Sequence, residues 1–202
     1  MFHTEDQRMS PDNNEPSAKA LADIFKNPEA MRKAIARFDD AVDDLFEPLR
    51  ENVWFNRIFY SASAMADHSL IWFLLAAIKA TRSGEQAKLA RRAAIVLAAE
   101  SLVVNMGVKS IFRRERPMYQ GERPLPLRQP LTSSFPSGHS SAAVCAYIFL
   151  SEKDSLAPLY FVLAMLIAPS RIHVKIHHAS DVIGGLIVGW LFAKLMRSFF
   201  PE

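Results

Sequence analysis

The sequence predicts an all-α protein, an integral-membrane helical bundle of about five transmembrane helices with amphipathic helices at its N-terminus. Apolar residues gather into five runs after residue 57, and several of these runs are apolar on nearly every face. A soluble helix carries a single apolar stripe instead. The segment before these runs is polar and acidic, and no segment alternates apolar and polar residues as a strand does.

The composition limits the class of protein. Of 202 residues, 50% are hydrophobic and 22% are charged, which excludes a wholly disordered chain. The single cysteine excludes an intrachain disulfide framework and a multi-cysteine metal site. The net charge of +3 permits either a nucleic acid or an anionic membrane as a partner.

The first 57 residues form two predicted regions. Residues 1–16 have no apolar periodicity and no signal-peptide core, so we expect a disordered tail. Residues 17–57 carry apolar residues at three- and four-residue steps, which predicts amphipathic helices, divided at Asn27-Pro28. These helices either pack on the rest of the fold or lie in the membrane interface, and the pattern supports both.

The remaining residues, 58–202, form the predicted transmembrane domain. Its apolar runs are 58–78, 93–112, 139–150, 156–169 and 182–200. The two shortest runs are closer in length to buried helices of a soluble protein, which is the alternative for the whole domain. Asp67 and His68 interrupt the first run, and Glu100 lies in the second. These three residues make structural contacts between helices or line an entrance for lipid.

Three polar groups remain between the runs, and the first contains Lys109, Arg116 and Pro117. Lys109 and Arg116 are seven residues apart, so they share one side if the stretch is helical. Two fixed cations there would bind an anion such as phosphate, and Pro117 would end the helix. The alternative is a basic flank at a membrane boundary, and we interpret the neighbouring Arg113 and Arg114 in that way.

The second group runs from Ser134 to Ser140 and contains Pro136-Ser137-Gly138-His139, which opens an apolar run. Free N–H groups at a helix N-terminus bind anions, and Gly138 permits close approach of the backbone. His139 in the first turn could exchange a proton with the anion. The alternative is an ordinary helix start that Ser137 caps.

The third group contains Ser170, Arg171, His177 and Asp181. On a helix, a carboxylate at position i+4 can bind one nitrogen of the imidazole and leave the other free as a base or nucleophile. Arg171 adds a third cation. The alternative is a cluster of histidine and lysine at the membrane interface, because His173, Lys175 and His178 lie nearby.

Together the three groups resemble the type 2 phosphatidic acid phosphatase family, whose signatures are KxxxxxxRP, PSGH and SRxxxxxHxxxD. The match is complete and in the same order, and it covers about residues 58–198. The loops after the second and fourth predicted spans lie on one side of the membrane, so all three groups face one compartment. The superfamily also includes vanadium haloperoxidases and soluble bacterial acid phosphatases.

The resemblance implies a phosphatase that needs no metal or other cofactor. His177 would attack phosphorus and form a phosphohistidine, Asp181 would orient His177, and His139 would protonate the leaving oxygen and then activate water. The resemblance also assigns the phosphate-binding residues and the supporting residues. The former are Lys109, Arg116, Ser137, Gly138 and Arg171, and the latter are Pro117, Pro136 and Ser170.

The expected substrate is a membrane lipid phosphate, such as phosphatidic acid, phosphatidylglycerol phosphate or a polyprenyl phosphate, diphosphate or phosphosugar. We expect a multi-pass protein of a bacterial plasma membrane. Cations between Lys79 and Arg92 predict a cytoplasmic loop there, and hence an extracytoplasmic site. No nucleic-acid partner is expected, and the oligomeric state is not predicted. The alternatives are a vanadate-dependent haloperoxidase and a non-enzymatic protein that binds or transports lipid phosphates.

Overall fold

A computed structural model describes residues 27–120 and 122–200 of the chain. The predicted tail, 1–16, and the predicted helix before Asn27 lie outside these residues. The chain divides into two compact units, Met1–Arg37 and Phe38–Glu202. Helix α2 (Pro28–Arg50) crosses this boundary, and its start is capped by Asn27, whose Oδ1 accepts from the backbone N–H of Glu29 at 3.0 Å.

Within the described residues all regular secondary structure is helical, which confirms the all-α class. The larger unit contains the rest of α2 and the other helices. These are α3 (Val53–Met65), η1 (Asp67–Ser69), α4 (Leu70–Ala80), α5 (Gly84–Leu102), the π-helix η2 (Val103–Val108), α6 (Lys109–Ile111), α7 (Gly138–Leu150), α8 (Ala157–His173) and α9 (Ala179–Phe199).

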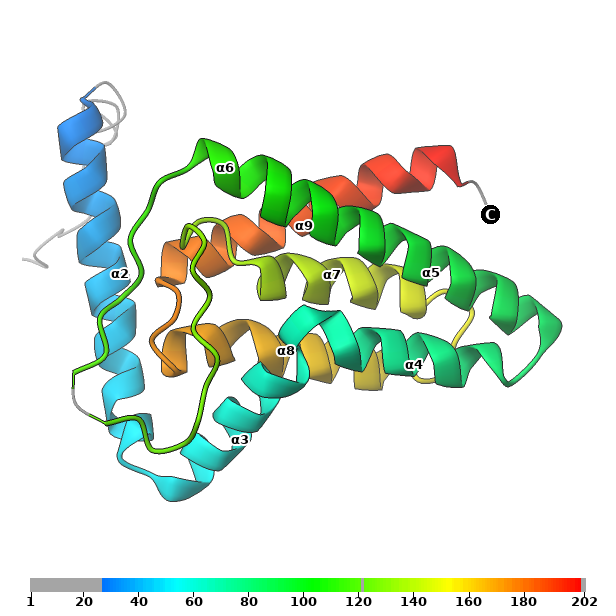
Figure 1. The fold of residues 1–202 in the computed structure, drawn as a ribbon, viewed down its shortest axis with the longest axis horizontal. Coiled ribbons are helices and arrows are strands. Elements are labelled where there is room, and N and C mark those ends of the chain that lie inside the picture. Colours follow the sequence, from blue (N-terminus) through cyan, green and yellow to red (C-terminus); the bar gives the residue numbers. More distant parts are fainter. Residues whose placement is uncertain (1–26, 121, 201–202) are drawn as a thin grey trace, which may run out of the picture. The chain divides into compact units, whose positions relative to one another are not determined.

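Helix α7 occupies the centre of the larger unit and packs against α5, α8 and α9 (Figure 1). Its buried residues from Ser140 to Ala146 are all small, which lets neighbouring helices approach closely, and Phe149 and Leu150 follow at its C-terminal end. Helix α4 pairs with α5, and α3 pairs with α8. The core is therefore a helical bundle that surrounds α7.

Two helical segments among the described residues are long and apolar enough to cross a membrane, Gly84–Ile111 and Ala179–Phe199. Helices α3 and α4 make a third candidate if they count as one bent span. Helices α7 and α8 are shorter apolar helices. The structure therefore contains two or three candidate spans, where the sequence predicts about five.

The first predicted run, 58–78, is broken in the middle. Helices α3 and α4 meet at an angle of 60°. At the break, His68 and Ser69 have φ of 53° and 59°, a left-handed conformation that ordinary residues seldom adopt. The break places Asp67 beside His139 of α7, with Oδ1 and Nε2 3.0 Å apart. The break therefore falls at Asp67 and His68, the polar pair that interrupts the apolar run in the sequence.

The part of α2 from Phe38 onward packs against the bundle. Val42 and Phe46 lie against the apolar residues Ala168, Ile172, Ala179 and Val182. Arg50 donates to the carbonyls of Ile172 and His173 at 3.1 and 2.9 Å. This part of the predicted amphipathic region therefore packs on the fold, which is one of the two possibilities that the sequence leaves open.

The predicted cytoplasmic cations are held by acids of the α7–α8 loop. Buried Lys79 donates to the carbonyls of Leu150 and Glu152 at 2.6 and 2.7 Å. Arg82 pairs with Asp154 at 2.6 Å, and Arg92 pairs with Glu152 at 3.0 Å. These contacts therefore stabilise the end of the bundle where α4, α5 and the α7–α8 loop meet. The same cations can also influence how the chain is oriented in a membrane.

The glycines of α9 let that helix contact α7 closely, as the sequence predicts. A Cβ on Gly189 would lie 2.3 Å from the Ser141 carbonyl oxygen, and one on Gly185 would lie 2.3 Å from the Ser137 carbonyl oxygen. Both atoms belong to backbone, so the helices would have to separate.

We expect Gly189→Ala to lower the free energy of unfolding in detergent by about 1–3 kcal/mol, because the added methyl overpacks the α7–α9 contact. Gly107→Ala is the matched control, since a Cβ there meets nothing within 4 Å. Denaturant unfolding of the two variants checks the prediction. Equal stability of the two proteins would contradict it.

Candidate active site

Lys109 and Gly138 bring the first two polar groups together. Lys109 follows the π-helix, lies in α6 and is buried, with a relative exposure of 8%. A Cβ on Gly138 would lie 3.5 Å from Lys109 Nζ and 3.1 Å from Asn105 Oδ1. The distance to Lys109 is an ordinary van der Waals contact and the one to Asn105 is tight, so Gly138 lets the start of α7 lie close to both side chains.

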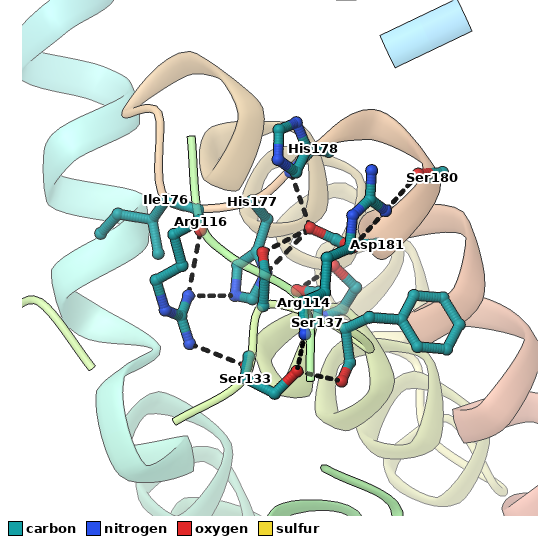
Figure 2. A network of polar contacts seen from close by, with 12 residues as sticks. Arg114, Arg116, Ser133, Ser137, Ile176, His177, His178, Ser180 and Asp181 are labelled. Carbon is teal, nitrogen blue, oxygen red and sulfur yellow. Dashed lines mark hydrogen bonds and ion pairs between the residues drawn. The ribbon is translucent and has the colours of Figure 1, made fainter. Parts of the chain in front are cut away.

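Arg116 reaches the site from a loop, because the helix that carries Lys109 ends at Ile111. The prediction of a shared helical face for Lys109 and Arg116 is therefore wrong. Backbone carbonyls hold the guanidinium instead, from Thr132, Ser133 and Ile176 at 3.0 to 3.2 Å. Arg116 Nη1 lies 3.2 Å from His177 Nε2 (Figure 2).

His177 and Asp181 lie close together, although His177 precedes α9 and is not part of it. The His177 Nδ1 to Asp181 Oδ2 distance is 3.7 Å, which is longer than a hydrogen bond. Ser134 lies between them, with its Oγ 2.5 Å from Asp181 Oδ2 and 3.4 Å from His177 Nδ1. Ser134 belongs to the second polar group, but the sequence gives it no role, because a serine in a loop carries no periodic signal.

The contacts of His177 define its proton positions. An arginine can only donate, so Nε2 must accept from Arg116 and Nδ1 must carry the ring proton toward Ser134 and Asp181. Burial lowers the pKa of His177 well below its usual value, and the charges of Arg171 and Arg116 add to this effect against the opposing influence of the nearby Asp181 carboxylate. His177 is therefore a neutral imidazole at neutral pH, with its lone pair on Nε2.

Arg171 lies in the last turn of α8 and has a relative exposure of only 1%. Its Nη1 donates to Ser63 Oγ of α3, whereas Nε and Nη2 are buried without a hydrogen-bond partner. Buried charged donors without acceptors are costly, and a bound anion would satisfy both.

His139 stands in the first turn of α7, and its Nε2 contacts Asp67 Oδ1 at 3.0 Å. Glu100, the other acid within a predicted span, accepts a bond from Ser141 Oγ at 2.5 Å and so links α5 to α7. The sequence left the roles of both acids open. The structure brings Asp67 to a candidate catalytic histidine and gives Glu100 a contact between helices.

The remaining predicted residues shape the loops. Ser137 caps α7, with its Oγ accepting from the Ser140 N–H, and its own N–H donates to the Asp181 carbonyl at 2.9 Å. Buried Ser170 donates to the Ile167 carbonyl at 2.6 Å. The two prolines lie close by: Pro136 is buried, and Pro117 lines a small cavity together with His177.

A cavity of about 610 Å³ opens onto Lys109, Gly138, His139 and His177, whereas Arg116 and Arg171 do not line it. One part of its lining is polar and contains Glu100, Asn105, Lys109, Gly138, His139 and His177. Another part is apolar and contains Leu102, Met106 and Leu131, all of them exposed. The cavity can therefore hold a molecule with a charged end and an apolar body.

Arg114 also belongs to this region, although the sequence pattern favours a basic flank at a membrane boundary for this residue. It donates to Asp181 Oδ1 at 2.7 Å and to Asp39 Oδ2 at 2.6 Å. Asp39 comes from α2 and is the buried residue of that helix. No pattern in the sequence connects residues so far apart. Among the described residues, no three His, Cys, Asp or Glu side chains form a group that could hold a metal ion.

Residues 89–202 match the profile of the PAP2 superfamily, which is more than half of the chain. The chain belongs to the PAP2 superfamily. Its curated PAP2 relatives include phosphatidylglycerophosphatase B of Bacillus subtilis, 31% identical over 109 residues, which cover 48% of this chain and 51% of that protein. The match thus spans about half the length of the Bacillus protein. Decaprenylphosphoryl-5-phosphoribose phosphatase of Mycobacterium tuberculosis is 30% identical over 139 residues, 67% of this chain and 75% of that protein.

Solved PAP2 structures have the same fold. The transmembrane PAP2-type phosphatidylglycerolphosphate phosphatase of Bacillus subtilis superimposes with a TM-score of 0.63 at 25% identity, over 88% of this chain and 89% of that one. LpxE of Aquifex aeolicus superimposes with a TM-score of 0.59 at 22% identity, over 77% and 93% of the two chains. The chain is therefore a homologue of membrane lipid phosphatases, with a transmembrane PAP2 fold.

Proposed function

We propose that the protein hydrolyses a lipid phosphate at the membrane, without a metal, through a phosphohistidine on His177. The observation that carries this proposal is the pair of unsatisfied donors on buried Arg171, whose charge acts on one neutral histidine. Arg171 has two buried donors without acceptors, and its charge acts on His177 together with that of Arg116. Lys109 and His139 line the same cavity as His177. A phosphoryl group is the anion that such a set fits.

In the first step, His177 Nε2 attacks phosphorus while the bond from phosphorus to the lipid oxygen breaks. His139 gives its proton to that oxygen, which leaves as a neutral alcohol. Asp181 and Ser134 stabilise the positive charge that develops on His177, because they face Nδ1. In the second step, His139 takes a proton from water, water oxygen attacks phosphorus, and the phosphorus–nitrogen bond breaks to return neutral His177 and phosphate.

The cations supply most of the stabilisation in this scheme. Lys109, Arg116 and Arg171 are positioned before the reaction, so no reorganisation is needed as charge moves onto the phosphoryl oxygens. The Gly138 N–H, at the start of α7, adds a backbone donor, and Ser137 holds that start in place through its cap. Asp67 orients the His139 ring through its bond to Nε2.

We propose five membrane segments: the bent pair α3–α4, the long helix from α5 to α6, and α7, α8 and α9. Helices α7 and α8 are short, but they can still act as membrane segments because the polar site occupies one end of the bundle. From the positive-inside rule we propose that the cations from Lys79 to Arg92 lie on the cytoplasmic side of a bacterial membrane, so that the site faces outward. We keep residues 1–16 as a tail, 17–57 as the amphipathic region and 58–202 as the phosphatase domain.

The substrate class follows from the two-sided cavity and from the relatives. A polar end beside His177 and an apolar side at Leu102, Met106 and Leu131 suit a phosphate at the end of a lipid. The curated relatives are named for phosphatidylglycerophosphate and for decaprenylphosphoryl-5-phosphoribose, both of which are lipid phosphates. We therefore propose a phosphomonoester of a glycerolipid or a polyprenyl lipid as the substrate.

Phosphate release from a panel of lipid phosphates in detergent tests this function. We expect release from at least one lipid, and we expect EDTA to leave the rate unchanged because no metal takes part. Loss of activity in EDTA, or the absence of release from every lipid, would refute the proposal. A parallel assay of halide oxidation with added vanadate tests the haloperoxidase alternative.

A further inference from the structure

Asp181 is fully buried, and its two carboxylate oxygens have different partners. Oδ2 faces the candidate nucleophile: it receives bonds from Ser134 Oγ at 2.5 Å and from the His178 N–H at 2.9 Å, and lies 3.7 Å from His177 Nδ1. Oδ1 receives a bond from Arg114 Nη1 at 2.7 Å. One arginine therefore holds the side of the carboxylate that faces away from His177 (Figure 2).

Arg114 is itself held at both ends. Its backbone N–H donates to Ser133 Oγ at 3.1 Å, and its carbonyl accepts from the Ser134 N–H at 2.9 Å. Its guanidinium donates to Ser180 Oγ at 2.7 Å and to Asp39 Oδ2 at 2.6 Å. The same residue thus supports both the serine and the carboxylate that face His177 Nδ1.

Asp39 completes the arrangement from outside the region that matches the superfamily. It is buried, with a relative exposure of 3%, and is the buried residue of a helix whose other side chains are exposed or half-buried. Besides Arg114, it accepts from Ser180 N–H at 2.7 Å and from Ser180 Oγ at 2.8 Å. Burying a charged aspartate is energetically unfavourable unless the charge is paired, and Arg114 provides that pairing for Asp39.

We propose that Arg114, held by Asp39, is a positioning residue that keeps Asp181 aligned with His177 during phosphoryl transfer. This inference rests on the proposed function, in which His177 becomes positively charged when it is phosphorylated. Asp181 must then meet that charge without rotating. With Arg114 on the far oxygen, rotation of the carboxylate would break a charged hydrogen bond, so the near oxygen stays directed at Ser134 and His177.

Arg114 therefore differs in role from Arg116, although only two residues separate them. Arg116 contacts the ring of His177 directly, whereas Arg114 contacts a carboxylate behind it. Loss of Arg116 would weaken both substrate binding and turnover. Loss of Arg114 would slow turnover and leave substrate binding almost intact.

The test compares Arg114→Met with Arg113→Met, its exposed neighbour, in the full-length protein in detergent. The substrate is the lipid phosphate that the wild-type protein hydrolyses, and rates are counted per active site by the amount of phosphoenzyme formed. We expect kcat to fall about tenfold to hundredfold in Arg114→Met, with little change in KM and no change in Arg113→Met. Arg114→Lys should recover part of the loss, because an ammonium can still pair with Asp181.

A double-mutant cycle separates positioning from folding. Asp39→Asn keeps an oxygen for the Ser180 N–H but removes the charge that holds Arg114, so we expect a smaller fall in kcat. Combined with Arg114→Met, it should add nothing further, since Asp39 acts through Arg114. If Arg114→Met does not fold, Asp39→Asn carries the test alone through kcat and KM.

The outcomes are distinct. An active wild-type protein with unchanged kcat per active site in Arg114→Met or Asp39→Asn overturns the positioning role. A loss confined to the number of active sites, with the same kcat for each, also overturns it, because that is the effect of a structural residue. Absence of phosphate release from the wild-type protein and from Arg113→Met refutes the proposed function instead.

Discussion

Replacement of His177 by asparagine is expected to reduce phosphate release by about 10⁴- to 10⁶-fold, because in the proposed mechanism no other group forms the covalent intermediate. Asparagine keeps a polar side chain in the buried position beside Arg116 but has no nucleophilic nitrogen. The measurement has two parts: release of phosphate from the lipid substrate, and transfer of labelled phosphate to the protein. Both are expected to disappear together.

His178→Asn is the control for this variant. His178 is the next residue in the chain, and its backbone N–H, which bonds to Asp181, survives the substitution. Asparagine is also a good residue for the start of α9. We expect activity close to that of the wild-type protein. A His177→Asn protein that still becomes labelled would show that the nucleophile is another residue.

Replacement of Arg171 by methionine lowers kcat/KM by about 10²- to 10³-fold, because two preorganised donors to the phosphoryl oxygens are lost. Methionine has a similar length and fills the buried space, so the packing of α8 changes little. Inhibition by orthovanadate, which resembles the transferring phosphoryl group, should weaken along with activity. Both quantities are measured on the same purified protein in detergent.

The matched control is Arg57→Met, which removes an exposed arginine from α3, the helix whose Ser63 contacts Arg171. We expect unchanged activity. If Arg171→Met kept wild-type activity and vanadate inhibition, the buried donors would have a structural role, and the phosphate site would have to lie elsewhere.

The positions of many helices were predictable because a run of apolar residues indicates a buried helix at that place in the chain. The start of α7 at Gly138 and the chain from α8 to α9 follow run boundaries that are visible in the sequence. The bend after Met65 was not predictable, since it depends on Asp67 meeting a histidine of another helix. The spacing of Lys109 and Arg116 puts them on one side only if the whole stretch is helical. The helix ends at Ile111, so Arg116 lies in a loop instead.

The residues around the candidate site also divide into those that the sequence predicts and those that it does not. Lys109, His139 and His177 belong to spaced motifs, so the sequence predicts them together, and the structure places them at one cavity. Ser134 and Asp39 belong to no motif. Their polar contacts join residues 47 and 141 positions apart in the chain. Such pairs arise only when separate helices pack, because hydrogen bonds over these separations leave no periodic trace.

The sequence by itself determined the helical class and the superfamily signatures, because both depend on local spacing and residue type. Only the packed structure shows which side chains hold His177 and Asp181 in place. It placed Ser134 between His177 and Asp181, and it placed Arg114 behind that carboxylate. The physical reason is that a hydrogen bond acts over about 3 Å, and only the packed bundle brings distant parts of the chain within that range.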